Sequence, residues 1–182
     1  MTATRLTVVS DYLLNLYARS AETPPTAYAS FALDGLRELI GATKAWWGIL
    51  SPTESGPLLL SSYRSNLPPT WEAAWEAVKQ DDPLARSLMQ TSNRTFSLDS
   101  SNIPKGSGLM RLADGFDIRE TIVSSVPLPE RGAFMFVSLY RGSAHRRFTP
   151  EEKTLGRLLI SHLHAGWSKN LGESLRSLWM VD

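Results

Sequence analysis

Apolar and small residues recur at three- and four-residue steps through the last third of the chain, which is the spacing of one helix face. A helix start precedes them, because Thr149 can accept a hydrogen bond from the amide of Glu152 while the Glu152 carboxylate reaches back. Pro150 suits the first helical position. We therefore predict a long helix whose inward stripe comprises Leu155, Leu158, Leu159, His162, Leu163, Gly166 and Trp167.

Four runs of β-prone residues occupy positions 43–50, 58–63, 121–128 and 133–140. Turn-forming residues join the first run to the second and the third to the fourth. Strands with such short connections pair antiparallel. Helical spacing predicts two helices before the first strand, interrupted near Pro25, and short helices between the two strand pairs.

The order of these elements predicts an α+β fold in which helices flank an antiparallel sheet on both sides, an α-β-α sandwich. The 182 residues fit one domain, 1–182, with a core of about 25–170. A weaker amphipathic stretch follows the long helix and is a candidate dimerisation surface. Its apolar residues are Leu171, Leu175, Leu178 and Trp179.

The composition narrows the functional classes. Lysine and arginine number 19 and aspartate and glutamate 18, so the net charge of +1 gives no electrostatic reason to expect nucleic acid as the main partner. The absence of cysteine excludes disulfides and thiolate chemistry. No apolar run is long enough for a membrane helix, and the first residues do not form a secretory signal. We expect a cytoplasmic protein.

Catalytic and metal-binding signatures are missing from the sequence. His162 and His164 are two positions apart on a helix and point in different directions, which disfavours a shared metal. No nucleophile elbow, phosphate-binding loop or zinc motif occurs. We expect no enzyme activity, no cofactor and no metal.

Aromatic residues provide the main candidate for chemistry. Four of the six tryptophans, Trp46, Trp47, Trp71 and Trp75, precede residue 80 and fall on elements that should flank one sheet. They either line a small-molecule pocket or fill the core, and the pattern leaves both interpretations open. Asp82 has a similar ambiguity, because its carboxylate can accept a hydrogen bond from a ligand or can cap the helix that begins at Pro83.

Several segments, in order and spacing, resemble the N-terminal ligand-binding domain of LuxR-type bacterial transcription regulators. That domain has a fold related to GAF and PAS sensors, and the resemblance covers roughly residues 25–170. The segments are Trp71-Glu-Ala-Ala-Trp75, Asp82-Pro83, Ala113-Asp-Gly-Phe116-Asp-Ile118-Arg119, Val126-Pro127-Leu128 and Phe148-Thr149-Pro150-Glu151-Glu152.

The resemblance implies roles for individual residues. In the members that bind acyl-homoserine lactones, an aromatic pair and an Asp-Pro pair line the pocket. By this resemblance, Trp71 of this chain would contact the lactone, Trp75 would stand where a tyrosine is usual, and Asp82 would bind the ligand amide. Strand and helix residues would form the wall for the acyl chain. The full candidate site is Trp46, Tyr63, Trp71, Trp75, Asp82, Leu98, Met110, Val123, Phe134, Phe136 and Ser138.

The sequence also departs from that family pattern. A tryptophan expected after the Asp82-Pro83 pair is absent, with Phe96 and Leu98 nearby, and Asp117 and Thr121 replace two glycines. These changes add bulk or charge. We therefore expect either a small apolar or amphipathic signal molecule other than an acyl-homoserine lactone, or no ligand.

Two hypotheses follow for the function. The first is a small-molecule-sensing regulatory domain, as in quorum sensing, that signals through a homodimer or through a heterodimer with a related regulator. The alternative is a ligand-free dimerisation module that antagonises a related regulator and has an aromatic-filled core. No helix-turn-helix reader is expected within these residues, so we expect no direct nucleic-acid binding and no membrane partner.

Overall fold

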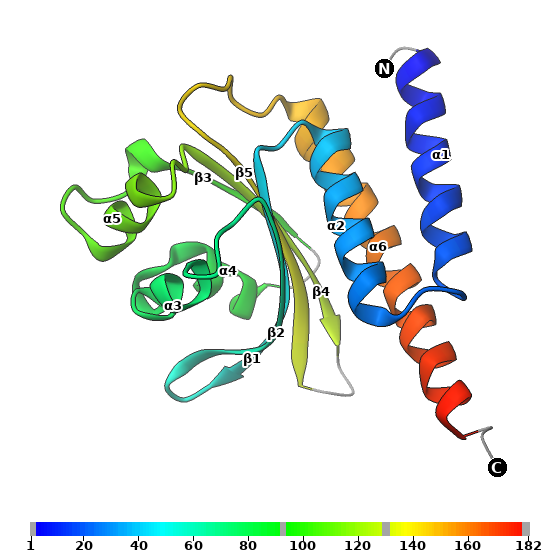
Figure 1. Ribbon diagram of the computed structural model, residues 1–182. Coiled ribbons are helices and arrows are strands. Elements are labelled where there is room, and N and C mark those ends of the chain that lie inside the picture. The colour runs from blue at the N-terminus through cyan, green and yellow to red at the C-terminus, as the bar shows by residue number, and fades with distance from the viewer. Residues whose placement is uncertain (1–2, 92–93, 129–131, 180–182) are drawn as a thin grey trace.

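The computed structural model describes residues 3–91, 94–128 and 132–179, with only the backbone described for 173–179. It has three layers, with a central sheet between two groups of helices (Figure 1). Helices on one side are α1 (Ala3–Arg19), α2 (Pro25–Ile40) and α6 (Pro150–Trp179), and those on the other are α3 (Trp71–Glu76), α4 (Pro83–Gln90) and α5 (Gly108–Gly115). The predicted α-β-α sandwich is confirmed.

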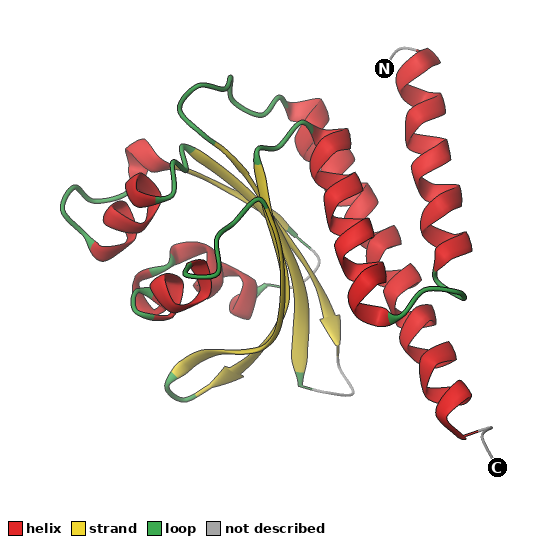
Figure 2. Cartoon of the chain, viewed as in Figure 1, coloured by secondary structure: helices red, strands yellow, loops and turns green. Residues whose placement is uncertain are grey.

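The sheet has five strands, and every neighbouring pair is antiparallel (Figure 2). Hairpins connect β1 to β2 and β4 to β5, as the sequence pattern predicts. From one edge to the other, the strands are β2 (Gly56–Ser65), β1 (Lys44–Thr53), β5 (Ala133–Arg141), β4 (Glu120–Leu128) and β3 (Thr95–Asp99).

Strand β3 is not among the predicted strands. It has five residues and pairs only with β4, so it forms one edge of the sheet. Phe96 and Leu98 are half-buried, and Thr95 Oγ1 lies 2.6 Å from Ser124 Oγ on β4. Phe96 and Leu98 alternate with polar residues, but the run is too short to be recognised from the sequence alone, and pairing with β4 makes it a strand.

Alternation along the strands separates two hydrophobic cores. On β5, Met135, Val137 and Leu139 pack with α2 and α6, whereas Phe136 and Tyr140 face α3, α4 and α5. On β1, the adjacent tryptophans Trp47 and Trp46 divide in the same way. The sheet is therefore covered on both faces, and each face has its own core.

The predicted start of α6 is confirmed in detail. The amide of Glu152 donates to Thr149 Oγ1 at 3.2 Å, and the amide of Thr149 donates to Glu152 Oε2 at 2.8 Å. Pro150 is the first helical residue. The helix continues to Trp179 and so includes the stretch predicted as a candidate dimerisation surface. The side chains of its residues Leu175, Leu178 and Trp179 are not described.

A buried ion pair anchors this helix start to the rest of the domain. Arg141, at the end of β5, donates to both carboxylate oxygens of Glu152 at 3.0 and 3.1 Å, and both side chains are about 5% exposed. Arg141 also donates to the carbonyls of Ile40 and Gly41 at the end of α2, each at 2.9 Å. Arg146, whose side chain is largely exposed, donates to both oxygens of the same carboxylate.

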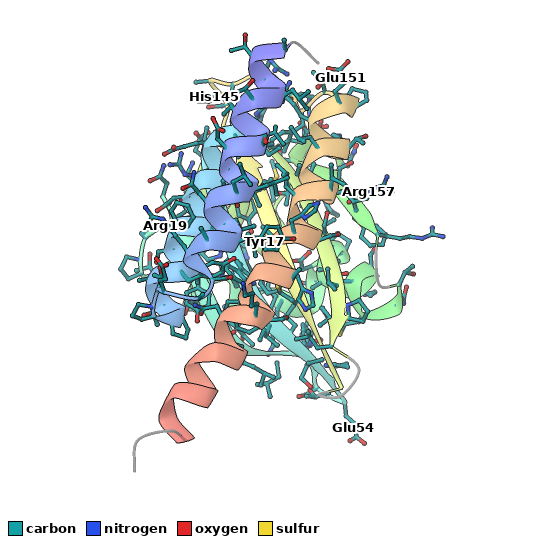
Figure 3. All side chains as sticks on the ribbon, turned by 90° about the vertical axis from the view of Figure 1, so that its right-hand side faces the viewer. Tyr17, Arg19, Glu54, His145, Glu151 and Arg157 are labelled. Atoms are coloured by element: carbon teal, nitrogen blue, oxygen red, sulfur yellow. The ribbon has the colours of Figure 1, made fainter. Side chains whose placement is uncertain are left out.

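Helix α1 lies outermost and contacts α2 and α6. Figure 3 shows it beside α6, with Tyr17 directed between the two helices. The Tyr17 hydroxyl lies 2.8 Å from Nδ1 of His162 on α6. Asn170, buried on α6, donates to the carbonyl of Ser20 at 3.0 Å and thereby holds the turn between α1 and α2. Among the described residues, none of the helices is long and apolar enough to span a membrane.

Acid should weaken the ion pair. Burial alone would raise the pKa of Glu152, but hydrogen bonds from Arg146, Arg141 and the Thr149 amide outweigh it and lower that pKa from 4.5 to about 2. Because the pKa of Glu152 is lower in the folded than in the unfolded state, its ionised carboxylate stabilises the fold above pH 4.5. This contribution to the free energy of unfolding, on the order of 3 kcal/mol, is lost as the pH falls toward 2.

We expect Glu152→Gln to lower the free energy of unfolding at pH 7 by about 3–5 kcal/mol, because it leaves Arg141 buried without its counter-charge. It should also flatten the loss of stability between pH 4.5 and pH 2. Urea unfolding at several pH values measures both effects. The exposed neighbour Glu151 provides the control, since Glu151→Gln should cost no more than about 1 kcal/mol. Equal effects of the two substitutions would contradict the assignment.

Candidate functional site

A cavity lies between the sheet and the layer formed by α3, α4 and α5, with a volume of about 60 Å³. Strands β1, β3, β4 and β5 supply its floor, and the helices and the turn before α5 supply its roof. Most of the lining is apolar. The lining residues are Trp46, Leu50, Trp71, Trp75, Asp82, Leu84, Ala85, Leu88, Leu98, Ile103, Leu109, Leu112, Ala113, Ile118, Thr121, Val123, Phe136, Ser138 and Tyr140.

Aromatic rings form a continuous cluster at this cavity. Trp46 lies edge-on to Trp71, Trp75 and Phe136, with ring centroids 5.6, 5.0 and 4.8 Å away. Trp71 in turn contacts Phe116 and Tyr140 at 5.1 and 5.4 Å. Edge-to-face packing at these distances is favourable for aromatic side chains. Trp71 and Trp75 share one face of α3, as their four-residue spacing predicts.

The three indole N–H groups of this cluster differ in their partners. Trp46 Nε1 donates to Ser62 Oγ at 2.7 Å, and Trp75 Nε1 donates to Asp82 Oδ2 at 2.9 Å. Trp71 Nε1 is buried and has no hydrogen-bond partner among the described residues. A buried donor without an acceptor is unfavourable. Among the described residues, Trp71 is therefore the one indole of this cluster whose N–H is left unsatisfied.

Asp82 has the capping role that its sequence context predicts as one alternative, and it also lies at the cavity. Its Oδ1 caps α4 by accepting from the amides of Leu84 at 2.8 Å and Ala85 at 3.3 Å, while Oδ2 binds Trp75. The carboxylate also lines the cavity. Burial raises its pKa above the ordinary value, although the hydrogen bonds from Trp75, Ala85 and Leu84 oppose that rise. Most of its accepting capacity is already used by the protein.

Tyr140 and Ser138 add two hydroxyl groups to the same wall. Burial raises the pKa of the Tyr140 phenol well above its ordinary value, a hydrogen bond with Ser138 opposes the shift, and the nearby Asp82 carboxylate adds to it. Tyr140 is therefore a neutral hydrogen-bonding group. The cavity thus offers neutral donors and one carboxylate, and no group of three or more metal-ligating side chains occurs in the described part of the chain.

The structure brings together eight of the eleven residues expected at the site. These are Trp46, Trp71, Trp75, Asp82, Leu98, Val123, Phe136 and Ser138. Tyr63 lies on the opposite face of the sheet, where it pairs in register with Trp47 and contacts its ring at 5.4 Å. Phe134 and Met110 belong to the same core as the cavity but do not line it.

Other lining residues were not predicted from the sequence. Tyr140 lies two positions from Ser138 on β5, and Thr121 lies two positions from Val123 on β4, so each shares a strand face with a predicted residue. The alternation of strand side chains could therefore have identified both. Ile103, in the loop before α5, has no comparable signal because only the folding of that loop over the sheet places it here. Of the two glycine positions of the family pattern, Thr121 lines the cavity, whereas Asp117 is exposed and accepts from the Ser143 amide at 2.9 Å.

The sequence matches no family model and no curated protein. The structure, however, is similar to several solved structures. It matches the N-acylhomoserine lactone-dependent LuxR-family transcription factor CepR2 from Burkholderia cenocepacia with a TM-score of 0.71 at 16% identity, over 96% of this chain and 98% of CepR2. SdiA from Escherichia coli matches with a TM-score of 0.67 at 16% identity, over 92% and 68% of the two chains.

A GAF domain also has this fold. The phycoerythrobilin-bound GAF domain of a cyanobacterial phytochrome matches with a TM-score of 0.60 at 11% identity, over 96% of this chain and 100% of the GAF domain. The chain therefore has the fold that LuxR-family ligand-binding domains share with GAF domains. The resemblance inferred from the sequence motifs is confirmed at the level of the fold.

Asp82 should contribute to stability as a cap and as the partner of Trp75. We expect Asp82→Ala to lower the free energy of unfolding by about 2 kcal/mol or more, because the Leu84 amide and the Trp75 N–H both lose their acceptor. Urea unfolding monitored by tryptophan fluorescence measures this change. The adjacent, exposed Asp81 is the matched control, and Asp81→Ala should stay within about 0.5 kcal/mol of the wild type.

Proposed function

We propose that residues 1–182 form a single small-molecule-sensing regulatory domain of the LuxR type, with the ligand held between the sheet and α3. The observation that carries this proposal is the Trp71 indole. Trp71 lines the cavity, and its N–H is buried without a partner among the described residues, whereas the other two indoles of the cluster are satisfied. A ligand carbonyl or ester oxygen would satisfy it, and the apolar walls would cover the rest of a small molecule.

The neighbouring structures support a ligand of this chemistry. CepR2 is described as dependent on N-acylhomoserine lactone, and SdiA is known in complex with octanoyl-rac-glycerol. Both compounds combine a carbonyl group with an apolar chain. By analogy, this domain binds a small apolar or amphipathic signal molecule and has a regulatory rather than an enzymatic role.

A physical route connects the cavity to the helices on the other side of the sheet. Phe136, Ser138 and Tyr140 on β5 line the cavity, and Arg141 directly follows them in the chain. Arg141 is bound to Glu152 at the start of α6 and to the end of α2. A ligand that displaces β5 would therefore act on α6, and we propose that α6 transmits the signal by changing the dimerisation of the domain.

The small size of the cavity favours an alternative function. A volume of about 60 Å³ is well below the roughly 300–1,000 Å³ of ordinary small-molecule sites. In this alternative, the aromatic cluster fills the core permanently, and the domain acts as a ligand-free dimerisation module that antagonises a related regulator. Light scattering tests this version, since it requires a dimer at micromolar concentration without any small molecule present.

The sensing proposal predicts that native mass spectrometry of the protein, after incubation with a bacterial cell extract, detects a retained small molecule. Trp71→Phe should weaken its retention about tenfold, because the ring remains while the N–H is removed. Trp167→Phe is the matched control, since Trp167 Nε1 is also buried without a partner but belongs to the core on the other face of the sheet. Retention that is equal in both variants, or absent from the wild type in every extract, would reject the proposal.

A further inference from the structure

We infer that Trp46 sets the upper size limit for ligands of this cavity, and that the wild-type domain therefore accepts compact molecules and excludes those with long acyl chains. This inference rests on the proposed function, because it assigns a specificity determinant to the same site. Trp46 is 3% exposed and projects from β1 into the space that a ligand would share.

The position of the Trp46 ring is the first argument. It contacts Trp71, Trp75 and Phe136, which come from the helical roof and from the strand next to β1. A ring that touches roof and floor together occupies the gap between them. The free volume of about 60 Å³ is what remains beside it. That space holds several non-hydrogen atoms but not an extended chain.

The second argument is that the ring is held in place by polar contacts. Trp46 Nε1 donates to Ser62 Oγ on β2 at 2.7 Å, and the Ser62 hydroxyl donates to Glu72 Oε1 on α3 at 2.6 Å. Arg64 Nε lies 3.3 Å from the same carboxylate oxygen. This chain of contacts fixes the indole and also connects the roof helix to β2. Moving Trp46 aside to admit a larger ligand would break the chain.

Glycine at position 48 completes the arrangement. Gly48 is opposite Phe136 in the pairing of β1 with β5, and a Cβ at this position would lie 2.8 Å from the Phe136 ring. The absence of a side chain lets that ring lie over β1, where it contacts Trp46. The packing of Trp46 is therefore built into the strand pair and is not an adjustable feature of the surface.

Octanoyl-rac-glycerol is a suitable probe, because it carries an ester carbonyl for Trp71 Nε1 and a chain too long for the present cavity. We expect calorimetric titration to show no measurable binding to the wild type and clear binding to Trp46→Ala, a gain of at least about tenfold. Engineered apolar cavities of about 150 Å³ bind small apolar molecules in this way. Trp47→Ala is the matched control, since it removes the adjacent buried indole but opens space on the other face of the sheet.

Two gentler variants keep the test decisive if Trp46→Ala does not fold. Trp46→Phe keeps an aromatic ring at this position, and Ser62→Ala keeps every ring while removing the hydroxyl that accepts from the Trp46 N–H and donates to Glu72. Both should bind octanoyl-rac-glycerol more tightly than the wild type and more weakly than Trp46→Ala. Circular dichroism confirms that each variant is folded.

Wild-type binding as tight as that of the variants would overturn the inference while leaving a ligand site in place. Failure of all three variants at positions 46 and 62 to gain affinity, or an equal gain in Trp47→Ala, would also overturn it. The proposed sensing function is tested separately by retention of an extract molecule and its loss in Trp71→Phe. Because the two tests use different molecules and different variants, failure of the size limit and failure of the sensing function are distinguishable.

Discussion

The buried pair of Arg141 and Glu152 is the constraint on which the arrangement of layers depends. Two charges removed from water are tolerated only when they are paired and their remaining hydrogen-bonding groups are satisfied. Here the guanidinium binds the Glu152 carboxylate and the carbonyls of Ile40 and Gly41, and its face lies 4.1 Å from the Phe148 ring centroid. One side chain thereby fixes the end of β5, the end of α2 and the start of α6.

That constraint also determines how the two cores can influence each other. The sheet lies between the cavity and the helices α2 and α6, and the buried residues on its two faces form separate cores. Adjacent residues on one strand nevertheless serve both, since Tyr140 lines the cavity and Leu139 packs in the opposite core. The sheet therefore connects the two cores, and Arg141 joins the end of β5 to the start of α6 through Glu152.

The aromatic cluster has to satisfy two opposing requirements. Close packing of Trp46, Trp71 and Trp75 stabilises the core, whereas a ligand needs space and an unpaired polar group. The protein satisfies the hydrogen bonds of Trp46 and Trp75 internally and leaves Trp71 unsatisfied. Among the described residues of this cluster, Trp71 thus combines an unsatisfied N–H with a position at the cavity, whereas the similarly unsatisfied Trp167 lies in the opposite core.

Local chemistry determined the features that the sequence predicts correctly. The capping box of Thr149 and Glu152, the hairpins and the side of the sheet for Trp46 and Phe136 all depend on residues a few positions apart. Tertiary structure alone decided the rest. Strand β3 exists because β4 pairs with it, Arg141 binds the carbonyl of Ile40 about a hundred positions away, and the cavity is small because rings from separate elements meet there. Such contacts join residues that are far apart in the chain and form only when whole layers pack together. A short sequence pattern therefore does not predict them.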